Sequence, residues 1–303
     1  MGIRSWPRSL AVEAAVGALV LVGMIVAWSP SAEAQSSRPA GEWHATGGDH
    51  TNTKYSPLDQ ITPDNFMDLE IAWRWASIST DVTERNRSLV PPNGFKTTPL
   101  MIDGLVYLST SFGQVVALDA GSGELIWSYD PHAYERMGRP ASMGWQHRGV
   151  AYWEDDESDD ARIFIALQDL RLVALNARTG ALYPDFGHGG FVDLSISLGR
   201  EINPVRVTHT SPVAIARDVV VVGSIVQDTN LRLREASPGH VRGFDARTGE
   251  MKWIFHTIPQ GDELAVETWE NESWRYSGHT NVWGTMAVDD ELGFVYLPTG
   301  TPT

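Results

Sequence analysis

The sequence predicts an all-β protein made of repeated antiparallel sheets, and three observations support this prediction. A phrase of about eleven residues occurs three times, starting at Ala117, Ala174 and Gly243, which lie 57 and 69 residues apart (174 − 117 and 243 − 174). Runs rich in β-branched and aromatic residues flank the copies. The composition, with 28 Gly, 17 Pro and 12 Trp among 303 residues, is typical of a turn-rich β architecture. A repeat of this kind indicates stacked β units rather than one compact α/β domain.

Each copy has the chemistry of a turn followed by a strand. The first reads Ala-Leu-Asp-Ala-Gly-Ser-Gly-Glu-Leu-Ile-Trp, in which Asp119 can accept backbone N–H groups and Gly123 can adopt a positive φ. The strand ends in Trp127 in the first copy and in Trp253 in the third, whereas the second has Tyr183 one place earlier. An indole can pack over a neighbouring unit while its N–H finds an acceptor. Four-stranded blades arranged radially use such a latch, so we predict a β-propeller.

The N-terminus is typical of an export signal. Arg4 and Arg8 precede an apolar run at 14–28, and Ser-Ala-Glu-Ala at 31–34 offers a cleavage site. We therefore predict a signal peptide at 1–34, a linker at 35–41 and a periplasmic protein. The apolar run is short for a bilayer span, which needs about 20 residues. An uncleaved anchor, and with it membrane association, is the alternative.

Residues 42–303 are predicted to form a partial propeller. No long helical periodicity follows Trp43, and the segment 64–75 is ambiguous. Strand-like runs occupy 104–110, 115–118, 163–166, 172–175, 219–222, 241–244 and 293–297. The acidic stretch 154–160 is expected to be a solvated loop at a blade edge, with a cation site as the alternative.

Counting the repeats gives about four blades. Three full phrases are preceded by what we interpret as a partial leading unit, and the chain ends in turn-forming residues at 297–303. A ring that ends there leaves sheet edges unpaired. We therefore expect the chain to be truncated.

Charge and cysteine content exclude several classes of function. A net charge of −15 argues against a nucleic-acid partner, which needs a basic face. The absence of cysteine excludes disulfides, thiolate metal sites, cysteine nucleophiles and lipid attachment at a lipoprotein cysteine.

Seven short blocks between residues 43 and 303 carry a family resemblance: 43–49, 52–58, 97–100, 147–153, 208–212, 281–284 and 295–300. Through them the sequence resembles the pyrroloquinoline quinone (PQQ) dependent alcohol and glucose dehydrogenases, a family of eight-bladed propellers. Each block is short, but all occur in the family's order and spacing. The stretch 267–271 is most similar to the glucose dehydrogenase branch. About four of the eight blades are therefore expected in this chain.

The resemblance implies five cofactor-binding residues. Trp283 falls where the planar quinone stacks, and Arg148 falls at the arginine that reaches its edge. Thr210 and Asn281 fall at positions that bond its polar rim, and Lys96 could pair with a carboxylate of PQQ. Each also has a structural interpretation: a core or latch tryptophan, a surface arginine, two strand-end residues and a rim lysine in water.

The resemblance further implies a calcium ion bound by oxygen ligands. Asp228 falls at the acidic ligand position, although an aspartate in such a loop is commonly a turn former. Thr301 stands where the alcohol dehydrogenases have asparagine, which puts the metal geometry in doubt. Many relatives also cover the quinone with a disulfide. Here the segment 142–147 has no cysteine, so Trp145 or His147 forms the roof, or the roof is open.

The implied function is oxidation of an alcohol or aldose by hydride transfer to PQQ, with electrons passing to ubiquinone or a cytochrome. The family's catalytic aspartate is expected beyond residue 303, so no catalytic base is assigned. The chain alone is expected to bind PQQ poorly or not at all and to be inactive. The alternatives are a non-catalytic propeller scaffold for envelope assembly and an inactive fragment.

Overall fold

The computed structural model describes residues 41–92, 94–140, 144–202, 206–227 and 236–302. Across these ranges the chain forms short antiparallel strands, and its α-helices are α2 (Ser79–Arg85) and α3 (Ala133–Met137). Three 3-10 turns lie at Phe66–Asp68, Val266–Thr268 and Glu270–Arg275. The all-β prediction is confirmed, and the ambiguous segment 64–75 contains only the first of these turns.

The predicted signal peptide at 1–34 and most of the predicted linker lie outside the described residues. Within the described part of the chain, no helix has the length and apolar character needed to cross a membrane.

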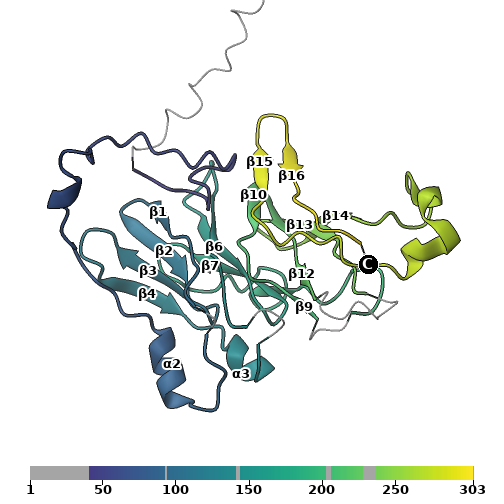
Figure 1. Cartoon of the computed structure of the whole chain (residues 1–303), viewed down its shortest axis with the longest axis horizontal. Helices are drawn as coiled ribbons and strands as arrows, with labels where there is room; N and C mark the ends of the chain where they lie inside the picture. Colours follow the sequence, from purple (N-terminus) through teal and green to yellow (C-terminus); the bar gives the residue numbers. More distant parts are fainter. Residues whose placement is uncertain (1–40, 93, 141–143, 203–205, 228–235, 303) are drawn as a thin grey trace, which may run out of the picture. The chain divides into compact units, whose positions relative to one another are not determined.

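Three four-stranded antiparallel sheets follow one another along the chain (Figure 1). The first consists of β1 (Leu100–Ile102), β2 (Leu105–Ser109), β3 (Val115–Asp119) and β4 (Leu125–Tyr129). The second consists of β5 (Ala151–Glu154), β6 (Ala161–Ala166), β7 (Arg171–Asn176) and β8 (Phe191–Asp193). The third consists of β10 (Ala214–Ala216), β11 (Val219–Val222), β13 (Val241–Asp245) and β14 (Met251–Phe255). Each is an up-and-down sheet, the unit of a propeller blade.

Two smaller sheets complete the described strands. One pairs β9 (Val207–Thr208) with β12 (Ile225–Val226), and the other pairs β15 (Ala287–Asp289) with β16 (Phe294–Tyr296). All seven strand-like runs expected from the sequence coincide with strands, namely β2, β3, β6, β7, β11, β13 and β16.

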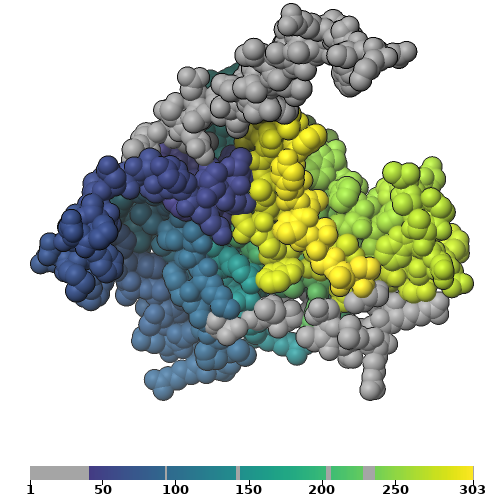
Figure 2. Space-filling view, turned by 45° about the horizontal axis from the view of Figure 1, so that its top comes forward, coloured from purple at the N-terminus to yellow at the C-terminus, as the bar shows by residue number. Residues whose placement is uncertain are grey.

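A two-stranded unit, β15 and β16, ends the described chain, and the predicted partial leading unit forms no sheet of its own among the described residues. The leading residues pair instead with strands of other units. Trp43 exchanges backbone hydrogen bonds of 2.8 and 3.0 Å with Met101 of β1, and the carbonyl of His50 accepts the N–H of Val288 of β15 at 2.7 Å. Figure 2 shows this purple N-terminal segment lying against the yellow C-terminal strands. A tight turn, in which Gly48 N–H bonds the carbonyl three residues earlier at 2.8 Å, limits the pairing of Trp43 to one bridge.

Each repeated phrase forms the turn after the third strand of its sheet. In the first phrase, an Asp119 carboxylate oxygen accepts the backbone N–H of Ser122 at 2.7 Å, and Gly123 closes the turn with φ of +73°. Asn176 and Asp245 accept the equivalent N–H groups in the second and third phrases. The turn predicted from the sequence is confirmed in all three.

An indole docks on the first phrase and another on the second. Nε1 of Trp73 donates to the carbonyl of Ala120 at 3.0 Å, and Nε1 of Trp127 donates to the carbonyl of Ala177 at 2.9 Å. A Cβ at Gly180 would lie 2.5 Å from the Trp127 ring, so the phrase glycine is also what lets the indole approach. The predicted tryptophan latch is confirmed for Trp127, whereas Trp73, which lies outside the repeated phrases, is a latch that the sequence did not indicate.

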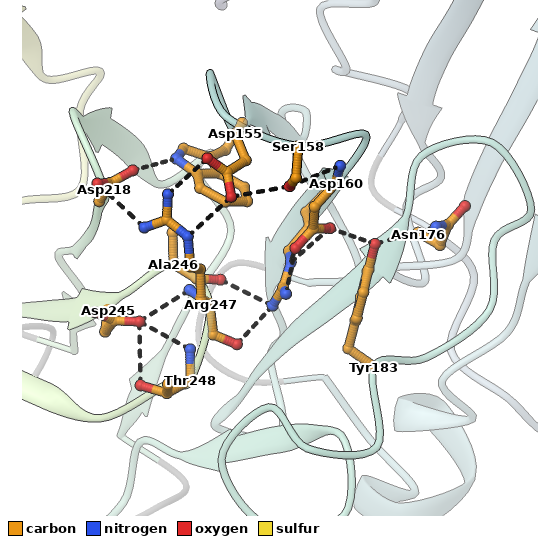
Figure 3. Close-up of polar contacts among 12 residues, drawn as sticks. Asp155, Ser158, Asp160, Asn176, Tyr183, Asp218, Asp245, Ala246, Arg247 and Thr248 are labelled. Carbon is orange, nitrogen blue, oxygen red and sulfur yellow. Dashed lines mark hydrogen bonds and ion pairs between the residues drawn. The ribbon is translucent and has the colours of Figure 1, made fainter.

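The third phrase is held by a guanidinium instead of an indole (Figure 3). Nη1 of Arg162, on β6, donates to the carbonyls of Ala246 at 3.0 Å and Arg247 at 2.6 Å. Ala246 has the same place in its phrase as Ala120 and Ala177 have in theirs. Arg162 therefore supplies the N–H donor that tryptophan supplies at the other two junctions.

Tyr183, the aromatic residue of the second phrase, supports this arginine rather than reaching the next sheet. The Arg162 guanidinium carbon lies 3.9 Å from the centre of the Tyr183 ring. The Tyr183 hydroxyl donates to Asp160 at 2.5 Å, and Asp160 forms an ion pair with Arg162 at 2.6 Å. The second phrase, whose aromatic residue comes one place early, therefore belongs to a sheet that is joined to the third sheet by an arginine instead of a tryptophan.

The acidic stretch 154–160 forms the turn between β5 and β6, and three of its carboxylates form ion pairs rather than being simply solvated as predicted, Asp159 with Arg178 at 3.2 Å among them. Asp160 pairs with Arg162, and Asp155 pairs with Arg247 of the third phrase at 2.9 Å. Arg247 also contacts Asp218 at 3.1 Å. The hydrogen bond from Arg247 holds the pKa of the Asp155 carboxyl well below its usual range. The stretch therefore joins the second sheet to the third.

Trp253 of β14 is 36% exposed, and its ring lies over Gly243 of the paired strand β13 rather than on the phrase of another sheet in the described chain. Elsewhere the sheets share apolar cores. Buried side chains of the first and second sheets form one cluster, and those of the second and third sheets form another. A smaller cluster joins the third sheet to the segment before β15 through Val221, Val241, Val282 and Met286.

We predict that Trp127→Ala destabilises the protein by about 3–5 kcal/mol, because a buried indole is lost and the Ala177 carbonyl loses its donor. Urea unfolding followed by circular dichroism measures this change. Trp253→Ala, which removes the same side chain from an exposed position, is the control and should cost much less. Equal losses in the two variants would contradict the latch assignment.

We also predict a pH-dependent effect of Asp155→Asn. Because the pKa of Asp155 is lower in the folded than in the unfolded chain, its ion pair stabilises the fold above about pH 4. That contribution is lost as the pH falls through the folded-state pKa. The variant should therefore be less stable than wild type at pH 7, and the difference should narrow below about pH 4. Urea midpoints at several pH values test this. Asp156→Asn is the control, because Asp156 has no ion pair with any described residue.

Candidate functional site

Four of the residues predicted to bind a cofactor have the same place relative to a sheet. Lys96, Arg148, Thr210 and Trp283 lie three or four residues before the first strand of successive units, which are β1, β5, β10 and β15. Consecutive blades therefore present these residues from equivalent loops.

Arg148 joins the second and third sheets at this end. Its backbone N–H donates to the carbonyl of Thr210 at 2.8 Å, and its Nη1 donates to the hydroxyl of Thr210 at 2.5 Å. Its own carbonyl accepts the N–H of Thr98 at 2.8 Å. Burial lowers the pKa of the Arg148 guanidinium, but an arginine keeps its charge in proteins. No carboxylate of the described residues lies within ion-pair distance of it. A half-buried positive charge is therefore held in place without a counter-charge.

Trp283 lies beside this cation. The Arg148 guanidinium carbon is 5.4 Å from the centre of the Trp283 ring, and the tryptophan is 50% exposed. The Ser211 hydroxyl donates to the Trp283 carbonyl and accepts a hydrogen bond of 3.3 Å from Nη1 of Arg148. The structure thus brings Arg148, Thr210 and Trp283 together, while their role in cofactor binding stays a prediction.

Lys96 is held by a residue that the sequence did not indicate. Its Nζ donates to Oε1 of Gln146 at 2.7 Å, and Gln146 is fully buried. Gln146 is two residues before Arg148, so the lysine belongs to the same rim. Within the described chain, Lys96 makes no hydrogen bond or ion pair with the other four candidates.

Asn281 is buried, and its side chain is directed at the neighbouring sheet. Its Nδ2 donates to the carbonyl of Ser224 at 2.8 Å, and its own carbonyl accepts the N–H of Gly300 at 3.0 Å. The side-chain donor is therefore used to hold the Trp283 segment against the end of β11, which agrees with the structural interpretation of this residue.

The two metal candidates are not brought together in the described structure. Asp228 lies outside the described residues. Thr301 is exposed, and its carbonyl accepts the N–H of Thr280 at 3.3 Å. No group of three or more His, Asp or Glu side chains in the described ranges could hold a metal ion.

The expectation that Trp145 or His147 covers the quinone is wrong, because both are buried. Trp145 packs against Phe112 in an apolar cluster. His147 accepts at Nδ1 from the Ser109 hydroxyl at 3.0 Å and donates from Nε2 to the carbonyl of Ala166 at 3.0 Å. The alternative, in which no side chain of this segment covers the quinone, remains a prediction, since residues 141–143 are not described.

Sequence reasoning assigned no individual role to Ser211 or Gln146, although each stands next to or near a predicted residue. Ser211 is part of the block around Thr210, and Gln146 precedes the Arg148 block. Their contacts run to residues 72 and 50 positions away, so the sequence carries no local signal for them.

The site has the features needed by a planar anionic ligand. An exposed indole face offers stacking, an unpaired guanidinium attracts negative charge, and two hydroxyls line the space between them. A cavity beside it is lined by Thr210, Ser211, Ser224, Val282 and Trp283. The residues present therefore fit a flat, carboxylated cofactor held at the end of a set of propeller blades.

The comparison with protein families agrees with this class. Residues 43–303 match the PQQ family model described as the glucose/ethanol/alcohol dehydrogenase β-propeller domain. The chain belongs to this family, and the propeller prediction is thereby confirmed.

Several curated proteins are similar to the chain. It is 29% identical to quinohemoprotein alcohol dehydrogenase ADH IIB of Pseudomonas putida and 33% identical to the glycerol dehydrogenase large subunit of Gluconobacter thailandicus. Each match covers 88% of this chain and 35% of the relative. The quinoprotein glucose dehydrogenase of Escherichia coli is 32% identical, over 98% of this chain and 39% of that protein. The chain therefore spans a little more than a third of the length of these relatives.

Solved structures show the same fold. The quinohemoprotein alcohol dehydrogenase ADHIIG of Pseudomonas putida superposes with a TM-score of 0.68 at 28% identity, over 88% of this chain and 35% of that one. The quinohemoprotein alcohol dehydrogenase of Comamonas testosteroni gives a TM-score of 0.67 at 24% identity, over 94% and 39%, which supports the fold alone.

We predict that His147 stays neutral at physiological pH, because burial lowers its pKa to about 4. Its C2-proton NMR signal, assigned with His147→Asn, should not titrate between pH 5 and 8. Between about pH 6.5 and 4, His147 binds a proton in the unfolded chain but not in the folded chain. The contribution of His147 to the free energy of unfolding should therefore decrease as the pH falls through this range. A titration midpoint above pH 6 would contradict the prediction.

Proposed function

We propose that this chain supplies one wall of the PQQ site of a dehydrogenase that oxidises an alcohol or an aldose. The observation that carries the proposal is the unpaired Arg148 guanidinium beside the exposed ring of Trp283. Family membership supports the same cofactor. The names of the relatives include alcohol, glycerol and glucose dehydrogenases, so the substrate class is a hydroxyl-bearing carbon. The resemblance of residues 267–271 to the glucose dehydrogenase branch favours an aldose or polyol.

The residues of this chain have distinct roles in the proposal. Trp283 provides a flat apolar face against which the cofactor rings stack. Arg148 stabilises negative charge at the cofactor's edge and holds it in register through a fixed planar fork. Thr210 fixes the guanidinium and offers a hydroxyl to the polar rim, and Lys96 offers a second positive charge to a carboxylate. PQQ, when bound, supplies the electron-accepting quinone for the oxidation.

We assign no catalytic base to this chain. Asp155 and Asp160 are paired with Arg247 and Arg162, so neither is assigned as the base. The proposal therefore places the base in a part of the protein that this sequence does not cover. It follows that this chain alone should bind PQQ weakly and turn over no substrate.

Calcium binding is also part of the proposal. Calcium takes oxygen ligands, and Asp228 with the carbonyl or hydroxyl of Thr301 offers that chemistry. The support for this assignment is the family resemblance. Reconstitution of the full-length protein with PQQ should require calcium and fail in the presence of a chelator.

Export to the periplasm, through the apolar run at 14–28, is proposed on the basis of the sequence alone. Electrons would pass to ubiquinone or to a cytochrome, and the quinohemoprotein names of several relatives are compatible with the second route.

We predict that PQQ added to this chain quenches tryptophan fluorescence weakly, and that Arg148→Leu lowers the affinity about tenfold or more, equivalent to about 1.4 kcal/mol. Titrations at constant salt measure this, because the interaction is electrostatic. Arg178→Leu is the matched control, since Arg178 is an exposed arginine on the turn of the second phrase. It should leave the titration unchanged.

Equal quenching of wild type and Arg148→Leu would contradict the proposed site. It would then favour the alternative of a propeller scaffold for envelope assembly, which has no reason to keep an unpaired arginine beside an exposed indole.

A further inference from the structure

The Ser211 hydroxyl is placed between the two residues that define the candidate site. It accepts a hydrogen bond from Nη1 of Arg148 at 3.3 Å and donates one to the backbone carbonyl of Trp283. Ser211 itself is half-buried and precedes β10. One side chain of the third unit therefore contacts the segment before β5 and the segment before β15.

The backbone around Ser211 is fixed from both sides. Thr210 accepts the N–H of Arg148 through its carbonyl at 2.8 Å, and a Cβ at Gly149 would lie 3.3 Å from Cγ of Pro212 and 3.0 Å from the carbonyl of Thr98. The chain before β5 and the chain before β10 are thus in close contact. The Ser211 hydroxyl has little freedom to move away from Arg148.

Residues 281–286, which carry Trp283, have few polar ties to the third unit. Among the described residues these are the hydrogen bond from Ser211 to the Trp283 carbonyl and the one from Asn281 to the Ser224 carbonyl at 2.8 Å. Asn281 fixes the chain two residues before the indole. Ser211 fixes the indole-bearing residue itself.

We propose that Ser211 is a positioning residue that sets the plane of the Trp283 ring relative to the Arg148 guanidinium. A hydroxyl that accepts from a cation becomes a stronger donor, so the positive charge of Arg148 strengthens the bond that holds Trp283. The guanidinium and the indole are then fixed together, 5.4 Å apart, before a ligand arrives. That the fixed Arg148–Trp283 pair serves as a platform for a cofactor rests on the proposed function. The placement of the two side chains by Ser211 does not depend on that proposal.

The test uses the 303-residue chain labelled with fluorotryptophan and observed by ¹⁹F NMR. The Trp283 signal is assigned with Trp283→Phe. We expect Ser211→Ala to shift or broaden the Trp283 signal and to leave the signals of the buried Trp127 and Trp145 unchanged. Ser211→Thr, which keeps the hydroxyl, should preserve the wild-type signal.

Ser195→Ala is the matched control, because Ser195 is also half-buried and its hydroxyl bonds a neighbouring side chain, Asp193, at 2.6 Å. It should leave the Trp283 signal in place. The thermal midpoint of each variant shows whether the fold is retained, and Ser211→Thr extends the test if Ser211→Ala does not fold.

A second measurement separates this inference from the proposed function. If both are right, Ser211→Ala should weaken PQQ binding about fivefold, as expected for the loss of one hydrogen bond, and Ser211→Thr should restore it. If wild type binds no PQQ but Ser211→Ala still moves the Trp283 signal, the positioning role stands and the proposed function fails. If the Trp283 signal is the same in wild type and Ser211→Ala, the positioning role is overturned, whatever the PQQ titration shows.

Discussion

The hydrogen bond from a side chain of one element to an alanine carbonyl in the next repeated phrase is the interaction on which the rest of the structure depends. The carbonyls of Ala120, Ala177 and Ala246 lie at equivalent places in tight turns, and each accepts an N–H donor that crosses the junction. Because the first sheet is joined to the second and the second to the third in this way, the loops before their first strands arrive at the same end of the blades. The candidate site is assembled from those loops.

The donors at these junctions differ in their physical nature. The indoles of Trp73 and Trp127 are neutral, so burial against a glycine is favourable without further compensation. Arg162 carries a charge into a site where it is only 6% exposed, which is costly unless the charge is paired and all its donors are used. Asp160, Tyr183 and two carbonyls meet that requirement. The junction between the second and third sheets is therefore ionic, and these are the two sheets whose first strands follow Arg148 and Thr210.

At the other end of the same sheets, charge is used in the opposite way. Arg148 has neutral partners, Thr210 and Ser211, and no carboxylate partner in the described chain. Its charge is thus available to an anionic ligand, whereas the charge of Arg162 is neutralised within the fold. Arg162, on β6, is therefore a structural cation, whereas Arg148, in the loop before β5, is suited to binding.

The sequence by itself determined the elements whose causes are local. The Asp-x-x-Ser/Thr-Gly turns and the seven strand-like runs follow from hydrogen bonding and φ preferences within a few residues. The family motifs singled out Arg148, Thr210 and Trp283, which the structure brings together. Only the tertiary structure decided the rest. The replacement of an indole by Arg162, the buried positions of Trp145 and His147, and the bridging role of Ser211 depend on partners 19 to 85 residues away. No local pattern encodes such pairings, because they exist only once the sheets have packed against one another.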